Sequence, residues 1–505
     1  MFLSKYNLKN INAQQVTVPD AALFDLPEKV LQFGTGVLLR GLPDYFIDKA
    51  NRQGLFNGRI VVVKSTETGD TSAFEKQDSL YTICVRGVEN GTAVSENIIC
   101  ASISRILNAK TEWNKILQCA HNPQLQVIIS NTTEVGIELV HDDILRYPPV
   151  SYPGKLLAFL HERYKAFAGS RQCGMVIVPT ELIPDNGKKL ESIVTELAYL
   201  NGLDEAFIDW LENSNHFCNS LVDRIVPGKP DLQKRPLVEK EIGYDDELLI
   251  MSELYRLWAI EGDEEIANIL TFAQADKGVV IAKDIDLFRE LKLRLLNGTH
   301  TLSCGVAFLS GFGTVKQAMD DARMEQFIGS LMKEEIAKAI PYQVDAQQAE
   351  TFADSVLDRF RNPQIEHQWI SITMQYSSKL RMRVLPVLQQ YYALYNTVPA
   401  HIALGFAAYI VFMRAVKEEN GTFYGKTDNG YYPIKDDKAW YFYEKWQTMK
   451  PAFVALSVLR DVSLWGYDLS LLPGFADAVT GRIEEILEHG MAAAFQPAES
   501  KKLTA

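Results

Sequence analysis

Three polar side chains of different chemistry lie close together in a leucine-rich stretch of the chain. Lys292, Asn297 and His300 bring an ammonium, an amide and an imidazole into a segment of nine residues. On an α-helix, which turns about 100° per residue, all three share one side, and Leu295 points the other way. Such a face can hold a carbonyl or alcohol oxygen and exchange a proton with it. The same spacing also fits a solvent-exposed face, and the Asn-Gly pair at 297–298 is typical of turns.

A second segment with chemical potential lies near the N-terminus. Residues 30–33 have the apolar character of a short buried strand, Gly34 and Gly36 follow, and an amphipathic run begins at Val37. A strand, a glycine turn and a helix begin a dinucleotide-binding fold, in which the free N–H groups of the helix hold a pyrophosphate. The third glycine of the usual pattern is replaced by Leu39, so the glycines also fit a tight turn without a ligand.

Both segments need a scaffold, and the first half of the chain alternates strand-like and helix-like runs. Strands are predicted at 59–63, 80–85, 92–94, 125–129 and 175–178, and helices at 155–167 and 189–200. The Asn-Gly pair at 90–91 predicts a hairpin turn. Alternating strands and helices indicate a mostly parallel sheet covered by helices on both faces.

Polar residues that follow a strand of such a sheet are candidates for ligand contacts. Asn131, Thr132 and Glu134 follow the strand predicted at 125–129. Ligands bind at the carboxyl ends of parallel strands, so these residues are expected on the nicotinamide side of a cofactor site. Each of them also fits a simple helix cap or turn.

The second half of the chain changes character. After a strand predicted at 279–282 the pattern is helical almost throughout, with helices at 324–340, 349–360, 370–387 and 402–418. The predicted fold is an α/β N-terminal Rossmann-like domain plus a mostly α-helical C-terminal domain. Residues 1–283 are expected to bind the dinucleotide and residues 284–505, which begin just before Lys292, to bind the substrate.

Composition narrows the class of protein. A chain of 505 residues with a net charge of −13 has no basic surface for nucleic acid. The longest apolar stretch, 402–413, is too short to cross a bilayer, and no signal peptide is recognisable, so no membrane partner is expected. Six cysteines without a Cys-x-x-Cys pair are typical of a reducing, cytoplasmic location. No His or Cys spacing typical of zinc occurs, so a metal-independent reaction is expected.

The two polar segments together resemble one family. Gly34, Gly36 and Arg40 fit a Gly-x-Gly-x-x-x-Arg start, and Lys292, Asn297 and His300 fit a Lys-x4-Asn-x2-His signature. Both are similar to the polyol-specific long-chain dehydrogenases, the mannitol dehydrogenase family. Four further segments resemble the branch of that family that interconverts tagaturonate and altronate: 130–134, 179–183, 221–226 and 359–363.

The resemblance implies a reaction and roles for the three residues. Hydride passes between a nicotinamide cofactor and the carbon of a ketone or alcohol. The Asn297 and His300 N–H groups are expected to stabilise the negative charge that grows on the oxygen, and Lys292 to act as general acid or base. The binding turn would use Gly34, Gly36 and Arg40.

A keto-uronate or aldonate substrate also carries a carboxylate, and arginine is its natural partner. Residues 359–383 contain a basic run from which the anchor is expected to come: Arg361, Lys379, Arg381 and Arg383, with Arg359 beside them. A solvated basic face is the alternative for any single one of these residues.

Several alternatives stay open at this level. NAD is the cofactor that the resembled branch implies, and Glu67 could serve its ribose, whereas Lys64 could accept the 2′-phosphate of NADP. The substrate could be that of a fructuronate reductase or a mannitol or polyol 2-dehydrogenase of the same family. A different class is a non-catalytic protein that binds a sugar acid or nucleotide. The sequence does not indicate an oligomeric state.

Overall fold

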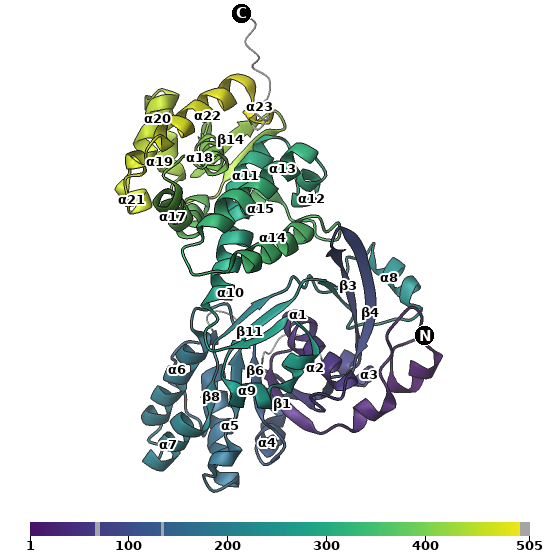
Figure 1. Ribbon diagram of the computed structural model, residues 1–505. Helices are drawn as coiled ribbons and strands as arrows, with labels where there is room; N and C mark the ends of the chain where they lie inside the picture. The colour runs from purple at the N-terminus through teal and green to yellow at the C-terminus, as the bar shows by residue number, and fades with distance from the viewer. Residues whose placement is uncertain (66–70, 133–135, 495–505) are drawn as a thin grey trace, which may run out of the picture. The chain divides into compact units, whose positions relative to one another are not determined.

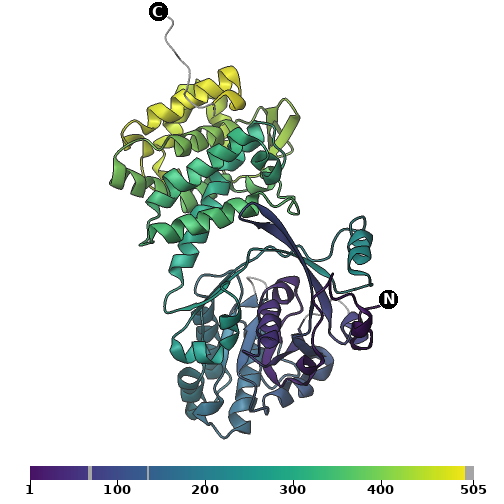
Figure 2. The same ribbon diagram turned by 45° about the vertical axis from the view of Figure 1, so that its right-hand side comes forward.

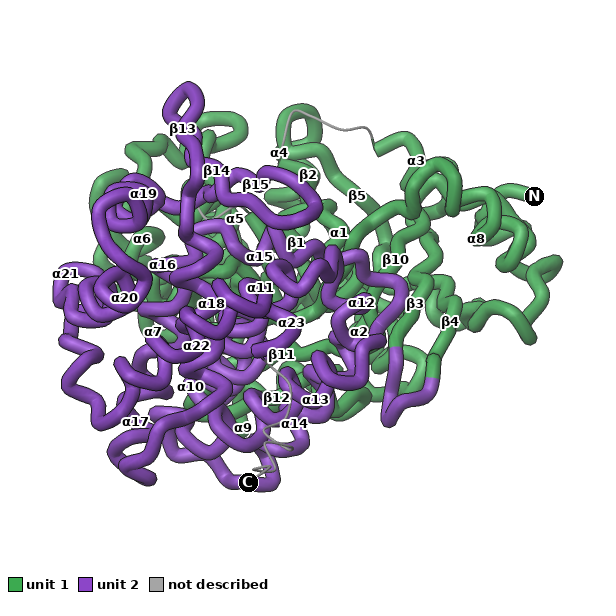
Figure 3. The backbone as a smooth tube through the Cα atoms, turned by 90° about the horizontal axis from the view of Figure 1, so that it is seen from above, with its two compact units in different colours: residues 1–87, 93–285 green, residues 88–92, 286–505 purple. Residues whose placement is uncertain are grey.

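A computed structural model of the chain describes residues 1–65, 71–132 and 136–494. The chain divides into two compact units, coloured separately in Figure 3. Unit 1 comprises Met1–Gly87 and Ala93–Ile285, and unit 2 comprises Val88–Thr92 and Asp286–Ala505.

A six-stranded parallel sheet forms the centre of unit 1. Its strands, in spatial order, are β5 (Ile103–Asn108), β2 (Arg59–Lys64), β1 (Glu28–Phe33), β6 (Val127–Ser130), β7 (Val176–Pro179) and β8 (His216–Phe217). The chain runs outward from β1 to β5 and then returns to β6 beside β1. This reversal is the topological switch point at which dinucleotides bind in doubly wound sheets.

The two faces of this sheet feed two different apolar cores. Alternate strand residues such as Leu31 and Ile128 pack against one set of helices, visible beside the sheet in Figure 1: α4 (Ala109–Cys119), α5 (Tyr152–Ala166), α6 (Asn186–Leu200) and α7 (Glu205–Ser214). Their neighbours, such as Val30 and Ile129, pack on the opposite face against residues of α1 (Val37–Gly41) and α2 (Pro43–Arg52). Strands buried on both faces explain the continuous valine and isoleucine runs.

The rest of unit 1 consists of two three-stranded sheets and short helices. One sheet has the order β10 (Ile250–Glu253), β3 (Tyr81–Glu89), β4 (Thr92–Cys100), and the other β12 (Val279–Ala282), β11 (Leu257–Glu261), β9 (Ser220–Asp223). The short helices are α3 (Ser72–Lys76), α8 (Arg235–Ile242) and α9 (Glu264–Ile269). The long β3–β4 hairpin, dark blue in Figure 2, turns at Asn90 and Gly91, both with positive φ, which confirms the predicted hairpin turn.

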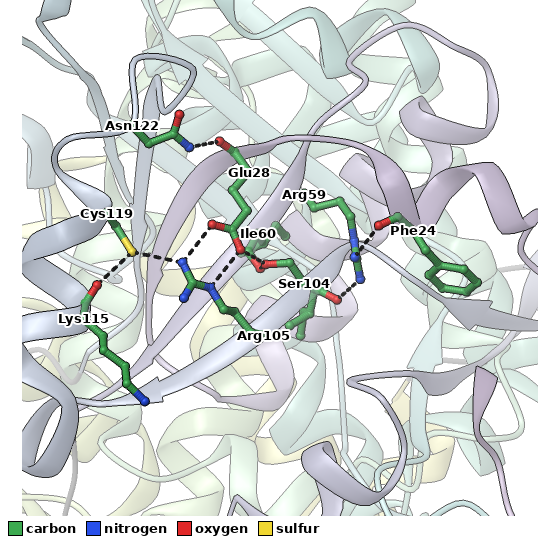
Figure 4. A network of polar contacts seen from close by, with 10 residues as sticks. Phe24, Glu28, Arg59, Ile60, Ser104, Arg105, Lys115, Cys119 and Asn122 are labelled. Carbon is green, nitrogen blue, oxygen red and sulfur yellow. Dashed lines mark hydrogen bonds and ion pairs between the residues drawn. The ribbon is translucent and has the colours of Figure 1, made fainter. Parts of the chain in front are cut away.

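Polar contacts fasten the start of β1 to its neighbours, as Figure 4 shows. The Glu28 carboxylate accepts hydrogen bonds from Arg105 Nε at 2.9 Å and from the Ser104 hydroxyl at 2.8 Å, both on β5. On β2, Arg59 Nη1 donates to the Phe24 carbonyl at 3.1 Å. These contacts set the position of β1 at the end opposite its glycine turn.

A buried polar cluster supports the glycine turn from inside unit 1. The Gln32 amide donates to the Gly34 carbonyl at 3.4 Å and to Asp44 Oδ2 at 3.5 Å. The Tyr81 hydroxyl donates to the same Asp44 oxygen at 3.2 Å. Burial raises the pKa of Asp44 to about 7, because a carboxylate loses its hydration there.

Unit 2 is mostly helical. Its α- and π-helices are α10 (Asp286–Leu291), a π-helix (Lys292–Gly298), α11 (Thr299–Leu309), α12 (Val315–Met319), α13 (Ala322–Ser330), a π-helix (Leu331–Ile336), α14 (Ala346–Phe360), α15 (Trp369–Ile372), α16 (Tyr376–Lys379), a π-helix (Leu380–Val384), α17 (Leu385–Tyr395), α18 (Ala400–Phe412), α19 (Ala439–Thr448), α20 (Pro451–Leu459), α21 (Val462–Trp465), α22 (Phe475–His489) and α23 (Met491–Ala494). With unit 1, this confirms the predicted fold class.

Several predicted helices of unit 2 differ from those observed. The helix predicted at 402–418 ends at Phe412 and is followed by an antiparallel sheet of β13 (Lys417–Glu419), β14 (Thr422–Thr427) and β15 (Gly430–Ile434), which sequence analysis missed. The helix predicted at 370–387 is interrupted at Gln375, whose φ of 52° is incompatible with a right-handed helix. Among the described residues, no helix is long and apolar enough to cross a membrane.

The raised pKa of the buried Asp44 carboxyl can be tested through the pH dependence of stability. With a folded pKa of about 7 against 3.8 for the ordinary group, folded protein holds more protons at Asp44 than unfolded protein between these values. Its contribution to stability is therefore present at low pH and lost as pH rises toward 7, by at most about 1.4 kcal/mol per pH unit. We expect Asp44→Asn, which keeps an oxygen acceptor, to raise the melting temperature relative to wild type more at pH 8 than at pH 5.

The matched control is Asp276→Asn. The Asp276 carboxylate accepts from Lys49 at 2.6 Å and from Arg256 at 2.8 Å, so its neutralisation should lower the melting temperature at pH 8. An Asp44→Asn difference that is equal at pH 5 and pH 8 contradicts the protonated carboxyl.

Candidate functional site

Lys292 and Asn297 lie on a π-helix, not on the regular α-helix that the sequence suggested, and His300 lies at the start of α11. The π-helix spans Lys292–Gly298 between α10 and α11. In a π-helix the hydrogen bond runs from residue i to i+5, so Lys292 and Asn297 lie one turn apart. Gly298 keeps helical angles, with φ −65° and ψ −47°, so the Asn-Gly pair forms no turn here. Single π-turns inside α-helices are frequent at functional sites.

Behind this segment the leucines pack as expected. Leu291 and Leu295 are buried in the main core of unit 2. Lys292, Asn297 and His300 are each half-buried as whole residues, and the ring nitrogen Nε2 of His300 is fully buried. Because the leucine side is fixed in the core, the polar side chains are held on a rigid element rather than on a loop.

His300 lies in an aromatic environment. Its ring stacks on Phe360 with a centroid separation of 4.1 Å and an interplanar angle of 10°. The rings of His367 and Trp369 meet it edge-on at 5.2 Å and 5.9 Å. Within the described part of the chain, His300 Nε2 is a buried atom without a hydrogen-bond partner. An orphaned ring nitrogen is costly in a protein interior and fits a ligand oxygen.

Positive charge surrounds this imidazole. Burial lowers the pKa of His300 well below its usual value, and His367, Arg359, Arg383 and Lys379 lower it further. His300 is therefore neutral at neutral pH, with one ring nitrogen that donates and one that accepts. Such a ring can donate a hydrogen bond to a carbonyl oxygen without giving up a proton.

The four predicted carboxylate anchors fall into two groups. Lys379 and Arg383 act electrostatically on His300, and burial together with Arg383 lowers the pKa of Lys379. Arg361 instead contacts two carboxylates, Glu325 at 2.8 Å and Asp358 at 3.0 Å, and Arg381 is exposed. The structure brings only the first pair to the His300 environment.

Sequence analysis missed three aromatic members of this environment, Phe360, His367 and Trp369. Phe360 ends α14, His367 lies in the loop before α15 and Trp369 begins α15, so all three are far along the chain from His300. None has a spacing that would have marked it, because the contact is made by tertiary packing. Within residues 1–65, 71–132 and 136–494, no group of three or more His, Cys, Asp or Glu side chains is placed to hold a metal ion.

In unit 1, the glycine turn follows β1 at the switch point of the sheet. Gly34 has φ +130°, and a Cβ there would lie 2.8 Å from Leu39 Cδ1 and 3.2 Å from the Asn131 carbonyl. Only glycine fits this position. A Cβ on Gly36 would meet nothing within 4 Å, and α1 begins directly after it. The turn thus offers open space and the unpaired N–H groups of a helix start.

The other predicted cofactor residues have structural partners. Asn131 Nδ2 donates to the Thr180 carbonyl at 3.1 Å, and the Thr132 backbone N–H donates to Glu181 Oε1 at 2.7 Å. These bonds join the carboxyl ends of β6 and β7. Glu134 and Glu67 lie outside the described residues.

Arg40 is buried, where the sequence suggested a residue at the binding turn. Its Nη1 donates to the Leu248 carbonyl at 2.6 Å, and its guanidinium lies over the Tyr81 ring at 5.3 Å. These contacts place Arg40 beside the polar cluster beneath the turn. A role in shaping the turn and direct contact with a cofactor both stay predictions.

Comparison of the whole chain with known proteins agrees with this architecture. The solved structure of Pseudomonas fluorescens mannitol 2-dehydrogenase, a ternary complex with NAD and D-mannitol, has a TM-score of 0.65 at 21% identity, with 98% of this chain and 99% of that chain covered. A D-sorbitol dehydrogenase in substrate-free form has a TM-score of 0.76 at 19% identity, with 98% and 100% covered. At these identities the likeness concerns the fold.

Sequence comparison is more specific. The altronate oxidoreductase of Halalkalibacterium halodurans is 37% identical over 475 residues, which cover 92% of each chain. That of Bacillus subtilis is 38% identical, covering 93% of this chain and 95% of its own. The mannitol dehydrogenase Rossmann domain matches residues 28–272, and the mannitol dehydrogenase C-terminal domain matches residues 284–487. The chain therefore belongs to the mannitol dehydrogenase family and is an oxidoreductase that acts on CH–OH groups.

Proposed function

We propose that the protein interconverts D-tagaturonate and D-altronate by NAD-dependent, metal-independent hydride transfer, with Lys292 as general acid and base. The observation that carries this proposal is the neutral, buried His300, whose orphaned Nε2 lies among cations next to the π-helix of Lys292 and Asn297. The altronate oxidoreductases that share more than a third of its sequence support the choice of substrate. A reducing cytoplasm is the compartment that its cysteines suggest.

The nucleotide would be held by the turn of Gly34 and Gly36. The missing side chains let the backbone approach a pyrophosphate, and the start of α1 offers N–H groups to it. NADH, when bound, supplies the hydride. Lys64 ends β2, the strand after which the ribose of such cofactors is recognised; NADP is therefore the alternative that the experiment below includes.

The polar trio would act on the reacting oxygen. As negative charge grows there during reduction, the amide of Asn297 and a ring N–H of His300 donate to it, and each such preorganised donor lowers the barrier by about 3 kcal/mol in comparable sites. Lys292 delivers the proton that completes the alcohol, and takes it back in the reverse direction.

The substrate carboxylate would be bound by Lys379 and Arg383. Both lie in the electrostatic environment of His300, and burial lowers the pKa of each, so an anion that arrives there replaces lost hydration. A local pair of cations is needed because the net charge of the chain is −13. A neutral polyol gains nothing from these two cations, which favours a sugar acid over mannitol.

Substrate and cofactor are tested in one series. Purified protein should oxidise NADH with D-tagaturonate faster than with D-fructuronate, and much faster than with D-fructose, and NADPH should be the poorer donor. The measurement is kcat/KM from the absorbance of the reduced cofactor. Fastest turnover with fructose rejects the sugar-acid assignment, and binding of NADH without turnover of any substrate favours the non-catalytic alternative.

The role of Lys292 is tested by Lys292→Ala. Loss of the proton donor should lower kcat by about 10²- to 10⁴-fold, while the affinity for NADH, read from its fluorescence, stays within about twofold. The control is Lys338→Ala, which removes an exposed lysine of the same unit that pairs with Glu334. A Lys292→Ala enzyme with wild-type kcat removes lysine from the mechanism.

The neutral state of His300 gives a pH dependence. Its folded pKa lies well below 6.5, so below about pH 6.5 the unfolded chain binds a proton that the folded chain does not, and stability falls as pH falls. We expect the drop in melting temperature between pH 7.5 and pH 5.5 to be smaller in His300→Gln than in wild type. Replacement of the exposed His489 by Gln should leave the wild-type drop unchanged. Equal drops in all three proteins contradict a neutral, buried His300.

A further inference from the structure

We infer that Arg294, braced by Glu290, is a positioning residue that locks the π-helix of Lys292 and Asn297 to the π-helix of Arg383. The inference rests on the proposed function for its kinetic consequence and on hydrogen bonds within unit 2 for its structural part. The hydrogen bonds of Arg294 go to Glu290 and to two backbone carbonyls, not to the reacting groups. Its action passes through the backbone.

Arg294 is held rigidly at its own end. Its side chain is 7% exposed. Nε donates to Glu290 Oε2 at 2.8 Å and Nη2 donates to Glu290 Oε1 at 3.2 Å, so the guanidinium and carboxylate form a two-bond fork. Such a fork fixes the plane of the guanidinium as well as its place. It also offsets the positive charge of Arg294, so this residue adds little to the cationic environment of His300.

The remaining nitrogen of Arg294 reaches the π-helix that contains Arg383, Leu380–Val384. Nη1 donates to the Met382 carbonyl at 2.7 Å and to the Arg383 carbonyl at 3.0 Å. Four residues after Met382 stands Pro386, which has no N–H and so cannot give that carbonyl its α-helical hydrogen bond. Arg294 supplies the Met382 carbonyl with a donor in place of that missing N–H.

Two further hydrogen bonds connect Arg383 back to the first π-helix, so that the contacts form a closed ring. Arg383 Nη1 donates to the Thr301 hydroxyl at 3.2 Å, and that hydroxyl donates to the Asn297 carbonyl at 2.7 Å. Asn297 and Arg294 belong to the same π-helix. Neither the candidate oxygen donor Asn297 nor the candidate carboxylate anchor Arg383 can shift without breaking a bond in this ring. The ring thus sets the distance between the two substrate contacts.

Loss of the ring would displace the groups that contact the substrate and so lower the rate of the reaction. Displacement of a substrate contact by about 1 Å costs about 10²-fold in rate in comparable cases. Lysine at position 294 keeps the charge but cannot form the planar fork and reach two carbonyls at once. Arg294→Lys should therefore lower kcat by about ten- to a hundredfold while KM for the sugar acid and the affinity for NADH change by less than about threefold.

The matched control is Arg163→Lys in unit 1. Arg163 is also a buried arginine, and it donates to four backbone carbonyls: Cys173, Ala120, Asn122 and Leu125. Both variants should lower the melting temperature, because both lose buried hydrogen bonds. Only Arg294→Lys should lower kcat. Equal kcat values in the two variants at equal loss of stability overturn the positioning role.

A second pair of variants tests the ring without changing a charge. Thr301→Val keeps the shape of the side chain and removes the hydroxyl that links Arg383 to Asn297, so kcat should fall by about tenfold. Thr301→Ser keeps the hydroxyl and should restore most of the wild-type kcat. Because both residues act in one ring, the double variant Arg294→Lys, Thr301→Val should lose less than the product of the two single losses. Multiplicative losses contradict a shared ring.

Hydrogen–deuterium exchange separates this inference from the proposed substrate. Amides in residues 292–301 should exchange faster in Arg294→Lys than in wild type and in Arg163→Lys, whichever sugar the enzyme uses. If wild type turns over none of the tested sugars and this difference is observed, the ring stands and the proposed function falls. If the sugars are turned over and the exchange is unchanged, the ring is overturned and the proposed function stands.

Discussion

The candidate site of unit 2 depends on one interaction, the burial of a neutral imidazole nitrogen among cations. Phe360 covers one face of His300, and the leucine side of the preceding π-helix is locked in the core. Removing water from this environment disfavours charge on the ring and strengthens every hydrogen bond made there. In the proposed reaction, a carbonyl oxygen would meet donors already in place, so that little reorganisation would accompany the growth of charge.

The corresponding constraint in unit 1 is the direction of the chain at the reversal between β1 and β6. Parallel strands all end at one edge, and the reversal leaves a space that no crossover helix covers. Gly34 can occupy its position only without a side chain, and the Asn131 carbonyl lies close behind it. The buried cluster of Gln32 and Asp44 supports the turn from below. The two units thus differ in what their sequences provide. Unit 1 provides a backbone turn without side chains at Gly34, and unit 2 provides polar groups that are partly shielded from water.

The sequence was most informative where local chemistry determines the backbone. Valine and isoleucine runs, the glycine at position 34 and the Asn-Gly pair at 90–91 indicated strands and turns that the structure contains. The π-helix at residues 292–298 was not predictable from local sequence, because tertiary contacts such as the hydrogen bonds of Arg294 stabilise its wider turn. His367 was missed for the same reason. The sheet at residues 417–434 was missed although the sequence becomes polar after Met413 and carries Asn-Gly pairs at 420–421 and 429–430, which are typical of hairpin turns.

The carbonyls that Arg294 binds lie 88 and 89 residues further along the chain. Bringing segments so distant together costs chain entropy that only a largely folded unit can offset. A growing polypeptide that has passed His300 therefore carries all three members of the signature before the contacts of Arg294 with residues 382 and 383 can form. Under the proposed function, turnover would report whether the helical unit has folded through residue 383, because a chain that stops before that point lacks the carbonyls that Arg294 binds.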